Sequence, residues 1–210
     1  MKNPHLTQPV VAWGRPLAAA QSAVIALHGR SHHPGDIQAV CARIGLDDFA
    51  CLAPTAPDNS WYPQVFAAPL EANEPKLSQS LECLDTLVRE IGAAGIGRQR
   101  IVLLGFSQGA CLIAEYALRH PGRYGALVVF TGSAIGPEGT QWNYPGGFAG
   151  TPVLVSGGTE DPWIPAHRMR ETAALLRGRG ARVEEHYYAG AEHVVNDDEI
   201  ALARTLLAAL

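Results

Sequence analysis

The sequence carries little excess charge, few aromatic residues and no long apolar run. The chain has 16 Lys and Arg residues and 20 Asp and Glu residues, so the formal net charge is -4 and the pI is about 6.0. The largest basic cluster, Arg98-Gln99-Arg100, is too small for a nucleic-acid footprint, and no nucleic-acid partner is expected. No apolar stretch approaches the roughly 18 residues of a spanning helix, which argues against stable membrane insertion.

Cysteine is also scarce. Cys41, Cys51, Cys83 and Cys111 form no CxxC pair and lie in apolar stretches. Buried free thiols are therefore favoured over disulfides or a zinc site. Residues 1–9 are polar and lack the charged-then-apolar pattern of a secretion signal, so a cytoplasmic location is expected.

The chain length of 210 residues suits one α/β domain covering residues 1–210. Apolar runs bounded by Gly or Pro predict strands at 23–27, 49–53, 101–104, 126–130, 152–156 and 182–188. Helical periodicity predicts helices at 77–91, 110–119, 166–177 and 198–207. This alternation favours a mostly parallel central sheet with helices on both faces, because parallel neighbours need crossover connections.

A serine bracketed by glycines follows one of these strands. Gly105-Phe106-Ser107-Gln108-Gly109 lies between the apolar run Ile101 to Leu104 and a predicted helix, which is the context of a nucleophile elbow. A GxSxG pattern alone means little in a chain with 22 glycines, and its position gives it weight. Ser107 is predicted to be a nucleophile, and the alternative is a serine that caps the helix.

A serine hydroxyl needs an imidazole base and a carboxylate that orients the imidazole. His193 lies in a loop between the last predicted strand and the last helix, whereas the other histidines have surface explanations or come too early in the chain. Asp161 is favoured over Glu160 because its shorter side chain, followed by Pro162, is held more rigidly. The order Ser107, Asp161, His193 is the order associated with α/β-hydrolases.

Charge that develops on a substrate carbonyl oxygen requires two preorganised N–H donors. Gln108 supplies one backbone N–H at the helix start, directly after the nucleophile. The second donor is expected in the loop after the first strand, where Gly29 lets the backbone approach the substrate. We assign it to the amide of Arg30.

These residues together resemble the phospholipase/carboxylesterase family, which includes the acyl-protein thioesterases. The resemblance spans nearly the whole chain, and GFSQGA at 105–110 is its most specific segment. The other matching segments are 27–30, 59–63, 73–75, 158–162 and 192–193. The resemblance implies an α/β-hydrolase fold and a cytosolic serine carboxylesterase without metal or other cofactor. It places the triad at Ser107, Asp161 and His193, and the oxyanion donors at Arg30 and Gln108.

The loop after Arg30 departs from the family pattern. It reads Ser31-His32-His33-Pro34-Gly35-Asp36 where small and acidic residues are expected, which predicts a reshaped acyl entrance. Solvent-facing histidines are favoured over a metal site at His32, His33 and Asp36, because adjacent histidines project differently and no further ligand cluster is evident. Contact of either histidine with substrate stays open.

Ligands of such sheets bind beyond the carboxyl ends of the strands, and several apolar residues are placed to cover that crevice. Trp61, Tyr62, Phe66 and Leu70 are predicted to form one wall of an acyl pocket, and Trp163 the opposite wall. The alternative is that this loop only packs on the domain.

A Gly-rich loop at 137–150 carries Trp142, Tyr144 and Phe148. We expect these aromatic residues to be exposed. They would then form either a homodimer contact or a mobile flap.

The sequence therefore predicts a serine carboxylesterase acting on small-molecule esters with short to medium acyl chains. An acyl-protein thioesterase or lysophospholipase is the nearest alternative, because the same triad attacks either carbonyl. A non-catalytic module that binds ligands on a hydrolase fold is less favoured. A dienelactone-type hydrolase is also compatible with the fold but would be expected to carry cysteine as its nucleophile.

Overall fold

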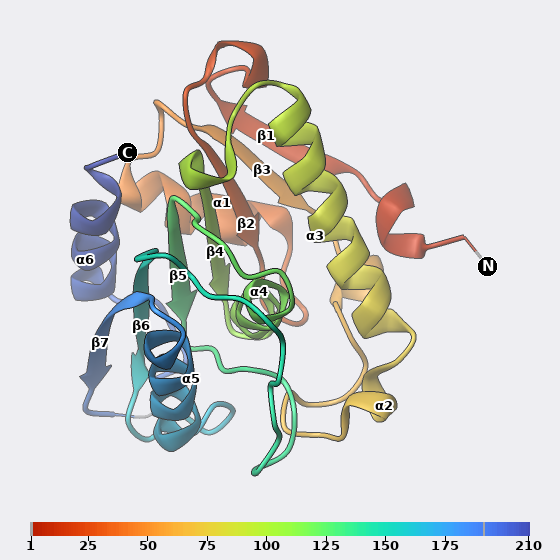
Figure 1. Ribbon diagram of the computed structural model, residues 1–210, viewed down its shortest axis with the longest axis vertical. Helices are drawn as coiled ribbons and strands as arrows, with labels where there is room; N and C mark the ends of the chain where they lie inside the picture. Colours follow the sequence, from red (N-terminus) through yellow and green to blue (C-terminus); the bar gives the residue numbers. More distant parts are fainter. Residues whose placement is uncertain (1, 191) are drawn as a thin grey trace.

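The computed structural model describes residues 2–190 and 192–210, and its centre is a seven-stranded sheet (Figure 1). The strands are β1 (Val10–Gly14), β2 (Ala23–Leu27), β3 (Ala50–Pro54), β4 (Ile101–Phe106), β5 (Ala126–Phe130), β6 (Pro152–Gly158) and β7 (Arg182–Tyr188). Their order is β1-β3-β2-β4-β5-β6-β7, with β1 antiparallel to β3 and the remaining pairs parallel. The predicted mostly parallel α/β sheet is confirmed.

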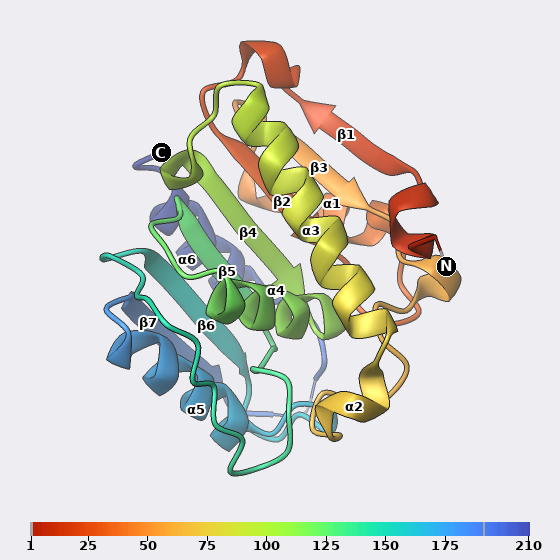
Figure 2. The same cartoon turned by 45° about the vertical axis from the view of Figure 1, so that its right-hand side comes forward.

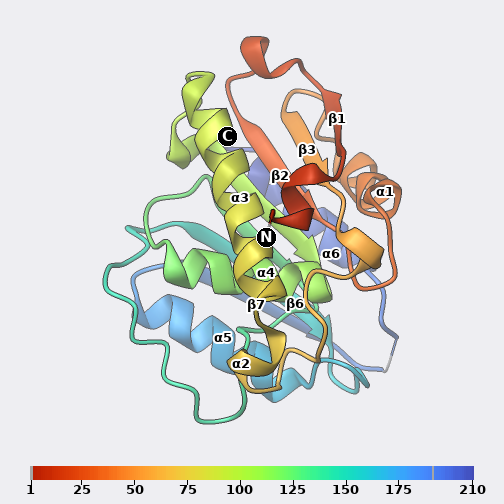
Figure 3. The ribbon, with the colours of Figure 1, turned by 90° about the vertical axis from the view of Figure 1, so that its right-hand side faces the viewer.

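Helices cover both faces of this sheet. They are α1 (Pro34–Ile44), α2 (Leu70–Asn73), α3 (Lys76–Ala93), α4 (Gln108–Arg119), α5 (Ala166–Gly178) and α6 (Asp197–Leu207). The helices α3, α4 and α5 lie on one face of the sheet, as Figure 2 shows. The helices α1 and α6 lie on the other face, which is visible when the molecule is turned further (Figure 3). Each face has its own apolar cluster, so the sheet is buried on both sides.

The central strands are the elements that the sequence predicts best. Every residue of β2, β4 and β5 is buried. A strand covered on both faces carries apolar side chains on both sides, and it reads as one continuous apolar run. The predicted bounds of all six strands agree with the structure to within two residues at each end.

Three of these elements were not predicted: the edge strand β1, the helix α1 and the four-residue helix α2. Residues of β1 are alternately exposed and half-buried, so no apolar run marks the strand. The helix α1 begins after His33, and the Asp36 carboxylate accepts a hydrogen bond from the His33 N–H at 2.7 Å. Histidine is not among the common residues at this position, which explains why the start of α1 was not recognised.

The prediction that the aromatic residues of the 137–150 loop are exposed is wrong. Trp142 and Phe148 are buried in the core, and Tyr144 is half-buried against it. The Arg179 guanidinium donates hydrogen bonds to the carbonyls of Trp142 and Tyr144. The loop is thus packed on the domain, and its aromatic residues give no support to a flap or a dimer contact.

The helix α6 begins with a capping box. Asn196 is the N-cap, and its side chain accepts a hydrogen bond from the Glu199 N–H at 2.9 Å. Glu199 is buried and accepts a hydrogen bond from Oγ of Ser156 at 2.7 Å, which joins α6 to β6. Burial raises the pKa of Glu199. Asp197 and Asp198 lie in the first turn of the helix.

The four cysteines are buried and free, as predicted. Among the helices of the described residues, none combines the length and the apolar content needed to cross a bilayer.

His5 is a buried titratable residue in the N-terminal 3-10 helix. Its ring stacks on Trp61 with centroids 5.8 Å apart, and its Nε2 lies 3.1 Å from Oγ of Ser80. The buried Nδ1 has no hydrogen-bond partner among residues 2–190 and 192–210. Burial, with a smaller contribution from Lys76, lowers the pKa of His5 to about 4. Protonation would therefore place a charge and an unpaired N–H in the core.

We expect acid to destabilise the fold through His5. Because its pKa is lower in the folded state than in the unfolded chain, the contribution of the neutral ring is complete above about pH 6.5 and is lost as the pH falls through about 4. The shift corresponds to roughly 3 kcal/mol at most. Urea unfolding between pH 7 and pH 4 should show a steeper loss of stability in the wild type than in His5→Phe. Parallel pH profiles would contradict this role.

Candidate active site

Ser107 occupies a strained turn between β4 and α4. Its φ of 54° and ψ of -121° lie outside the regions usual for a residue with a side chain. A Cβ on Gly105 would lie 2.7 Å from the backbone of Gly109 and Ala110, and a Cβ on Gly109 would lie 2.5 Å from the Leu27 carbonyl oxygen. The two glycines therefore let the strand turn directly into the helix. The turn presents Ser107 at the carboxyl edge of the sheet.

Three side chains that are distant in sequence meet at this edge. Nε2 of His193 lies 2.8 Å from Oγ of Ser107, and Nδ1 of His193 lies 2.6 Å from Oδ2 of Asp161. Asp161 follows β6, and His193 lies in the loop between β7 and α6. With its Nδ1 proton directed at the carboxylate, the imidazole has a free lone pair at Nε2 for the serine hydroxyl proton.

The Asp161 carboxylate is held from two sides. Its Oδ1 accepts hydrogen bonds from the N–H groups of Trp163 and Ile164, each at 2.8 Å, while Oδ2 faces His193. The side chain of Asp161 is fully buried, whereas Glu160 is exposed. The shorter carboxylate thus has a single orientation, as the sequence argument required.

Arg30 and Gln108, the two predicted oxyanion donors, both line the cavity that Ser107 also lines. Neither N–H has a hydrogen-bond partner among the described residues, whereas the amides of Ser31 and His32 bond to the carbonyls of Asn59 and Gly29. Two unpaired donors beside a nucleophile are what a developing oxyanion requires.

The side chains of the same two residues hold the loop 60–64, a role that the sequence did not indicate. The Arg30 guanidinium donates hydrogen bonds at 2.6 to 3.0 Å to Ser60, Tyr62, Pro63 and Gln64. The side-chain amide of Gln108 accepts a hydrogen bond from the Trp61 N–H at 3.0 Å through Oε1, and its Nε2 donates one to the Tyr62 carbonyl at 2.8 Å. Arg30 and Gln108, whose backbone N–H groups are unpaired in the described part of the chain, therefore also position the loop 60–64 with their side chains.

His28 is hydrogen-bonded to Gly29, Ala56 and Trp61. The Ala56 N–H donates to Nε2 of His28 at 3.2 Å, so the ring proton lies on Nδ1 and is donated to the Gly29 carbonyl at 2.8 Å. Nε1 of Trp61 donates to the His28 carbonyl at 2.8 Å. Burial lowers the pKa of His28, which keeps the ring in the neutral form that these bonds need. The sequence argument set this histidine aside because of its early position.

A cavity of about 550 Å³ opens beside Ser107. Of the residues predicted to line an acyl pocket, Tyr62, Phe66 and Trp163 do so. Trp61 and Leu70 do not, because Trp61 is fully buried behind the loop and Leu70 packs on the core. The predicted wall is corrected in these two positions.

Other residues of this cavity were not predicted, chiefly Val65, Cys111 and Ile164. Cys111 lies one helical turn after Ser107, and its fully buried thiol accepts a hydrogen bond from the Ser133 N–H at 3.3 Å. Burial raises the pKa of Cys111 to about 11, so the group is a neutral thiol at neutral pH. We therefore regard Cys111 as part of the cavity wall.

Residues 15–210 match the family model described as phospholipase/carboxylesterase. The chain belongs to the phospholipase/carboxylesterase family. Among solved structures, a phospholipase/carboxylesterase from Dyadobacter fermentans DSM 18053 is 39% identical with a TM-score of 0.92, covering 96% of this chain and 97% of that chain. Esterase PE8 is 24% identical with a TM-score of 0.78 at the same coverage, which shows the fold alone. These findings confirm the α/β-hydrolase fold.

Curated relatives of the family match at lower coverage. A probable carboxylesterase SOBER1-like protein of Arabidopsis thaliana is 25% identical over 164 residues, which are 71% of this chain and 62% of that protein. Acyl-protein thioesterase 1 of Eremothecium gossypii is 35% identical over 92 residues, covering 42% of this chain and 37% of that protein. The matches span less than two thirds of these two relatives.

His32 and His33, in the loop that departs from the family pattern, have different environments. His33 precedes α1, where its N–H is bonded to Asp36. His32 stacks on Phe106 with centroids 5.8 Å apart and lines the cavity. Within residues 2–190 and 192–210, no group of three or more His, Cys, Asp or Glu side chains is arranged to hold a metal ion.

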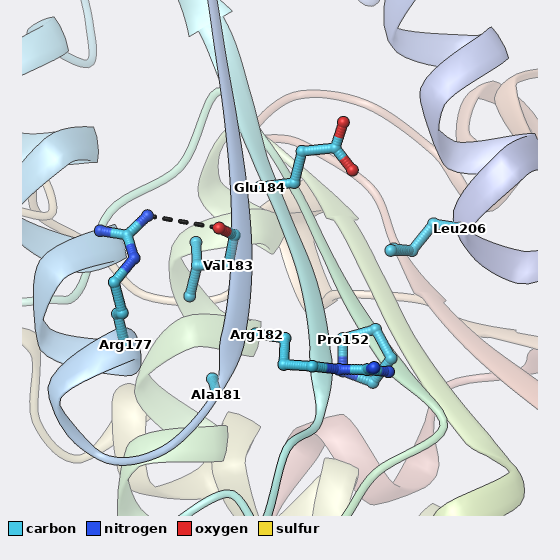
Figure 4. Close-up of a pocket in the computed structure, with 7 residues that line it drawn as sticks. All are labelled: Pro152, Arg177, Ala181, Arg182, Val183, Glu184 and Leu206. Carbon is cyan, nitrogen blue, oxygen red and sulfur yellow. Dashed lines mark hydrogen bonds between the residues drawn. The ribbon is translucent and has the colours of Figure 1, made fainter.

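A separate hollow of about 530 Å³ lies on the edge strand β7, between α5 and α6 (Figure 4). Pro152 and Arg182, which line it, begin β6 and β7, whereas Asp161 and His193 follow the other ends of these strands. The hollow is therefore at the end of the sheet away from Ser107. It carries charged side chains, which are common on edge strands, and the Val183 carbonyl accepts a hydrogen bond from Arg177.

Replacing Gly109 with alanine is expected to destabilise the protein. The new Cβ would lie 2.5 Å from the Leu27 carbonyl oxygen and 2.6 Å from that of His28, and overpacking of this kind costs about 1–3 kcal/mol. Gly92→Ala in α3 is the matched control, because its Cβ would meet nothing within 4 Å and alanine favours a helix over glycine by about 1 kcal/mol. Urea unfolding measures both variants. A Gly109→Ala protein as stable as the wild type would refute the packing argument.

Proposed function

We propose that the protein is a serine carboxylesterase that hydrolyses esters with short to medium acyl chains through an acyl-enzyme on Ser107. One observation carries the proposal. The hydrogen-bonded series of Ser107, His193 and Asp161 stands beside two unpaired backbone amides at the mouth of an apolar cavity. Family membership supports the same chemistry.

The first half of the reaction forms the acyl-enzyme. The ester carbonyl oxygen points at the amides of Arg30 and Gln108, and Oγ of Ser107 attacks the carbonyl carbon while Nε2 of His193 takes the hydroxyl proton. The tetrahedral intermediate collapses by breaking the bond to the alcohol oxygen, which receives that proton from His193. Asp161 remains ionised and stabilises the imidazolium.

The second half releases the acid. With the alcohol gone, the neutral imidazole of His193 removes a proton from a water molecule, whose oxygen attacks the acyl carbon. The same two amides stabilise the second oxyanion. Breaking the bond to Oγ returns the proton to Ser107 and yields the free carboxylic acid. A thioester would follow the same steps with a thiol as leaving group, so paired oxygen esters and thioesters must be compared directly.

Ser107→Ala should abolish turnover of p-nitrophenyl butyrate without unfolding the protein. Loss of a triad nucleophile lowers kcat by about 10⁶-fold in a well-studied serine protease. Ser78→Ala, at an exposed position of α3, is the matched control and should retain full activity. A fluorophosphonate probe should label the wild type and Ser78→Ala but not Ser107→Ala. Substantial turnover by Ser107→Ala would end the assignment, and an unlabelled wild type would favour a non-catalytic module.

The cavity volume predicts the acyl-chain preference. A space of about 550 Å³ holds a ligand of moderate size, and its rim carries the polar groups of Arg30 and Gln64. We expect kcat/KM on p-nitrophenyl esters to rise from acetyl to medium chains and then to fall. A steady increase up to palmitoyl would show that the protein prefers long lipids.

A further inference from the structure

Two cavities adjoin His193, and one of them also borders Ser107. Besides the 550 Å³ cavity, a smaller one of about 230 Å³ borders His193 from the other side, and both share His32 and His193. The walls of the larger cavity include Phe66, Cys111 and Ile164, from the apolar cluster under α3, α4 and α5. The walls of the smaller cavity include Ile37, Phe106 and Val195, from the cluster under α1 and α6. The two spaces therefore open over opposite faces of the sheet.

Aromatic side chains lie where the two spaces adjoin, at the shared residues His32 and His193. The ring centroids of Phe106 and His193 are 4.9 Å apart. The ring of His32 stacks on Phe106 with a centroid distance of 5.8 Å. The smaller cavity is lined by His193 but not by Ser107, Arg30 or Gln108. It thus adjoins the proton-transferring imidazole without adjoining the nucleophile or the two amides.

The stereochemistry of the reaction assigns a use to each space. The carbon of the tetrahedral intermediate carries Oγ of Ser107, the oxyanion, the acyl chain and the leaving oxygen. The oxyanion faces Arg30 and Gln108, and the leaving oxygen must be within reach of Nε2 of His193. The larger cavity, which borders Ser107 and Gln108, takes the acyl chain. The geometry points to the smaller cavity as the binding site of the alcohol part of the ester, an inference that rests on the function proposed above.

The side chains around the smaller cavity indicate which alcohol it accepts. Its charged groups are already partnered: Asp36 bonds to the His33 N–H, and Arg43 bonds to the Val195 carbonyl at 2.9 Å and to Asp197 at 2.8 Å. The remaining walls are mainly apolar, and include Val40 and the exposed Val194. Among the described residues that line the cavity, the one arginine is already engaged and leaves no free guanidinium for a phosphate. Its volume of about 230 Å³ is below the roughly 300–1,000 Å³ usual for ligand sites, so the cavity fits a small, neutral, apolar alcohol.

Two ester series separate the cavities experimentally. One series varies the alcohol, from methyl butyrate to hexyl butyrate, and the other varies the acid, from methyl butyrate to methyl octanoate. In Val40→Trp, which fills the smaller cavity, the hexyl-to-methyl ratio of kcat/KM should fall by about tenfold or more, while the octanoate-to-butyrate ratio is unchanged. The matched variant is Val65→Trp, at an exposed position that lines the larger cavity. It should lower the octanoate-to-butyrate ratio of kcat/KM and leave the hexyl-to-methyl ratio unchanged.

Val40→Lys is a second test if the tryptophan variant does not fold, because Val40 is a half-buried position of α1 where a lysine stem is tolerated. It should also lower the hexyl-to-methyl ratio of kcat/KM, which is called the alcohol ratio below. An alcohol ratio unchanged by both Val40 variants, or lowered by Val65→Trp alone, overturns the assignment of the smaller cavity. These outcomes leave the esterase proposal intact, whereas a wild type that cleaves none of the esters and takes up no fluorophosphonate refutes the esterase itself.

Discussion

The site depends on the close approach of α4 to the end of β2. Gly109 has no Cβ, and it therefore lies directly against the carbonyls of Leu27 and His28. This contact puts the first amides of α4 and the loop after β2 on the same side of Ser107, although nearly eighty positions separate Arg30 from Gln108 in the sequence. The strained φ of Ser107 belongs to the same turn, and the packing of buried strands on both sides holds it in place.

Around this contact, most polar groups have a fixed partner except those that would meet a substrate. Both oxygens of Asp161 are engaged, and His28 uses both ring nitrogens. The side chains of Arg30 and Gln108 are occupied with the loop 60–64, while their own amides are unpaired among the described residues. Such preorganisation favours electrostatic stabilisation of an oxyanion, because little reorganisation is needed when charge develops.

The elements predictable from the sequence are those whose signal is local. The buried strands read as apolar runs, and the elbow reads as glycines around Ser107 between a strand and a helix. Chain order and loop position were enough to select His193 and Asp161, which the structure brings to Ser107. What could not be read locally depends on contacts between distant segments. The burial of Trp142 and Phe148, the displacement of Trp61 from the cavity, and the bonds from Arg30 to the loop 60–64 are of this kind. The helix α1 was missed for a different reason, since its cap is an uncommon one.

The most direct measurement of the central claim is identification of the covalent intermediate. Wild-type protein is mixed with p-nitrophenyl butyrate, quenched in acid within the first turnovers and digested for peptide mass spectrometry. A butyryl group on Ser107, absent when His193 is replaced by alanine, is the predicted result. Turnover of the ester with no acylated Ser107 at any quench time, or with the acyl group on another side chain such as Cys111, would contradict it.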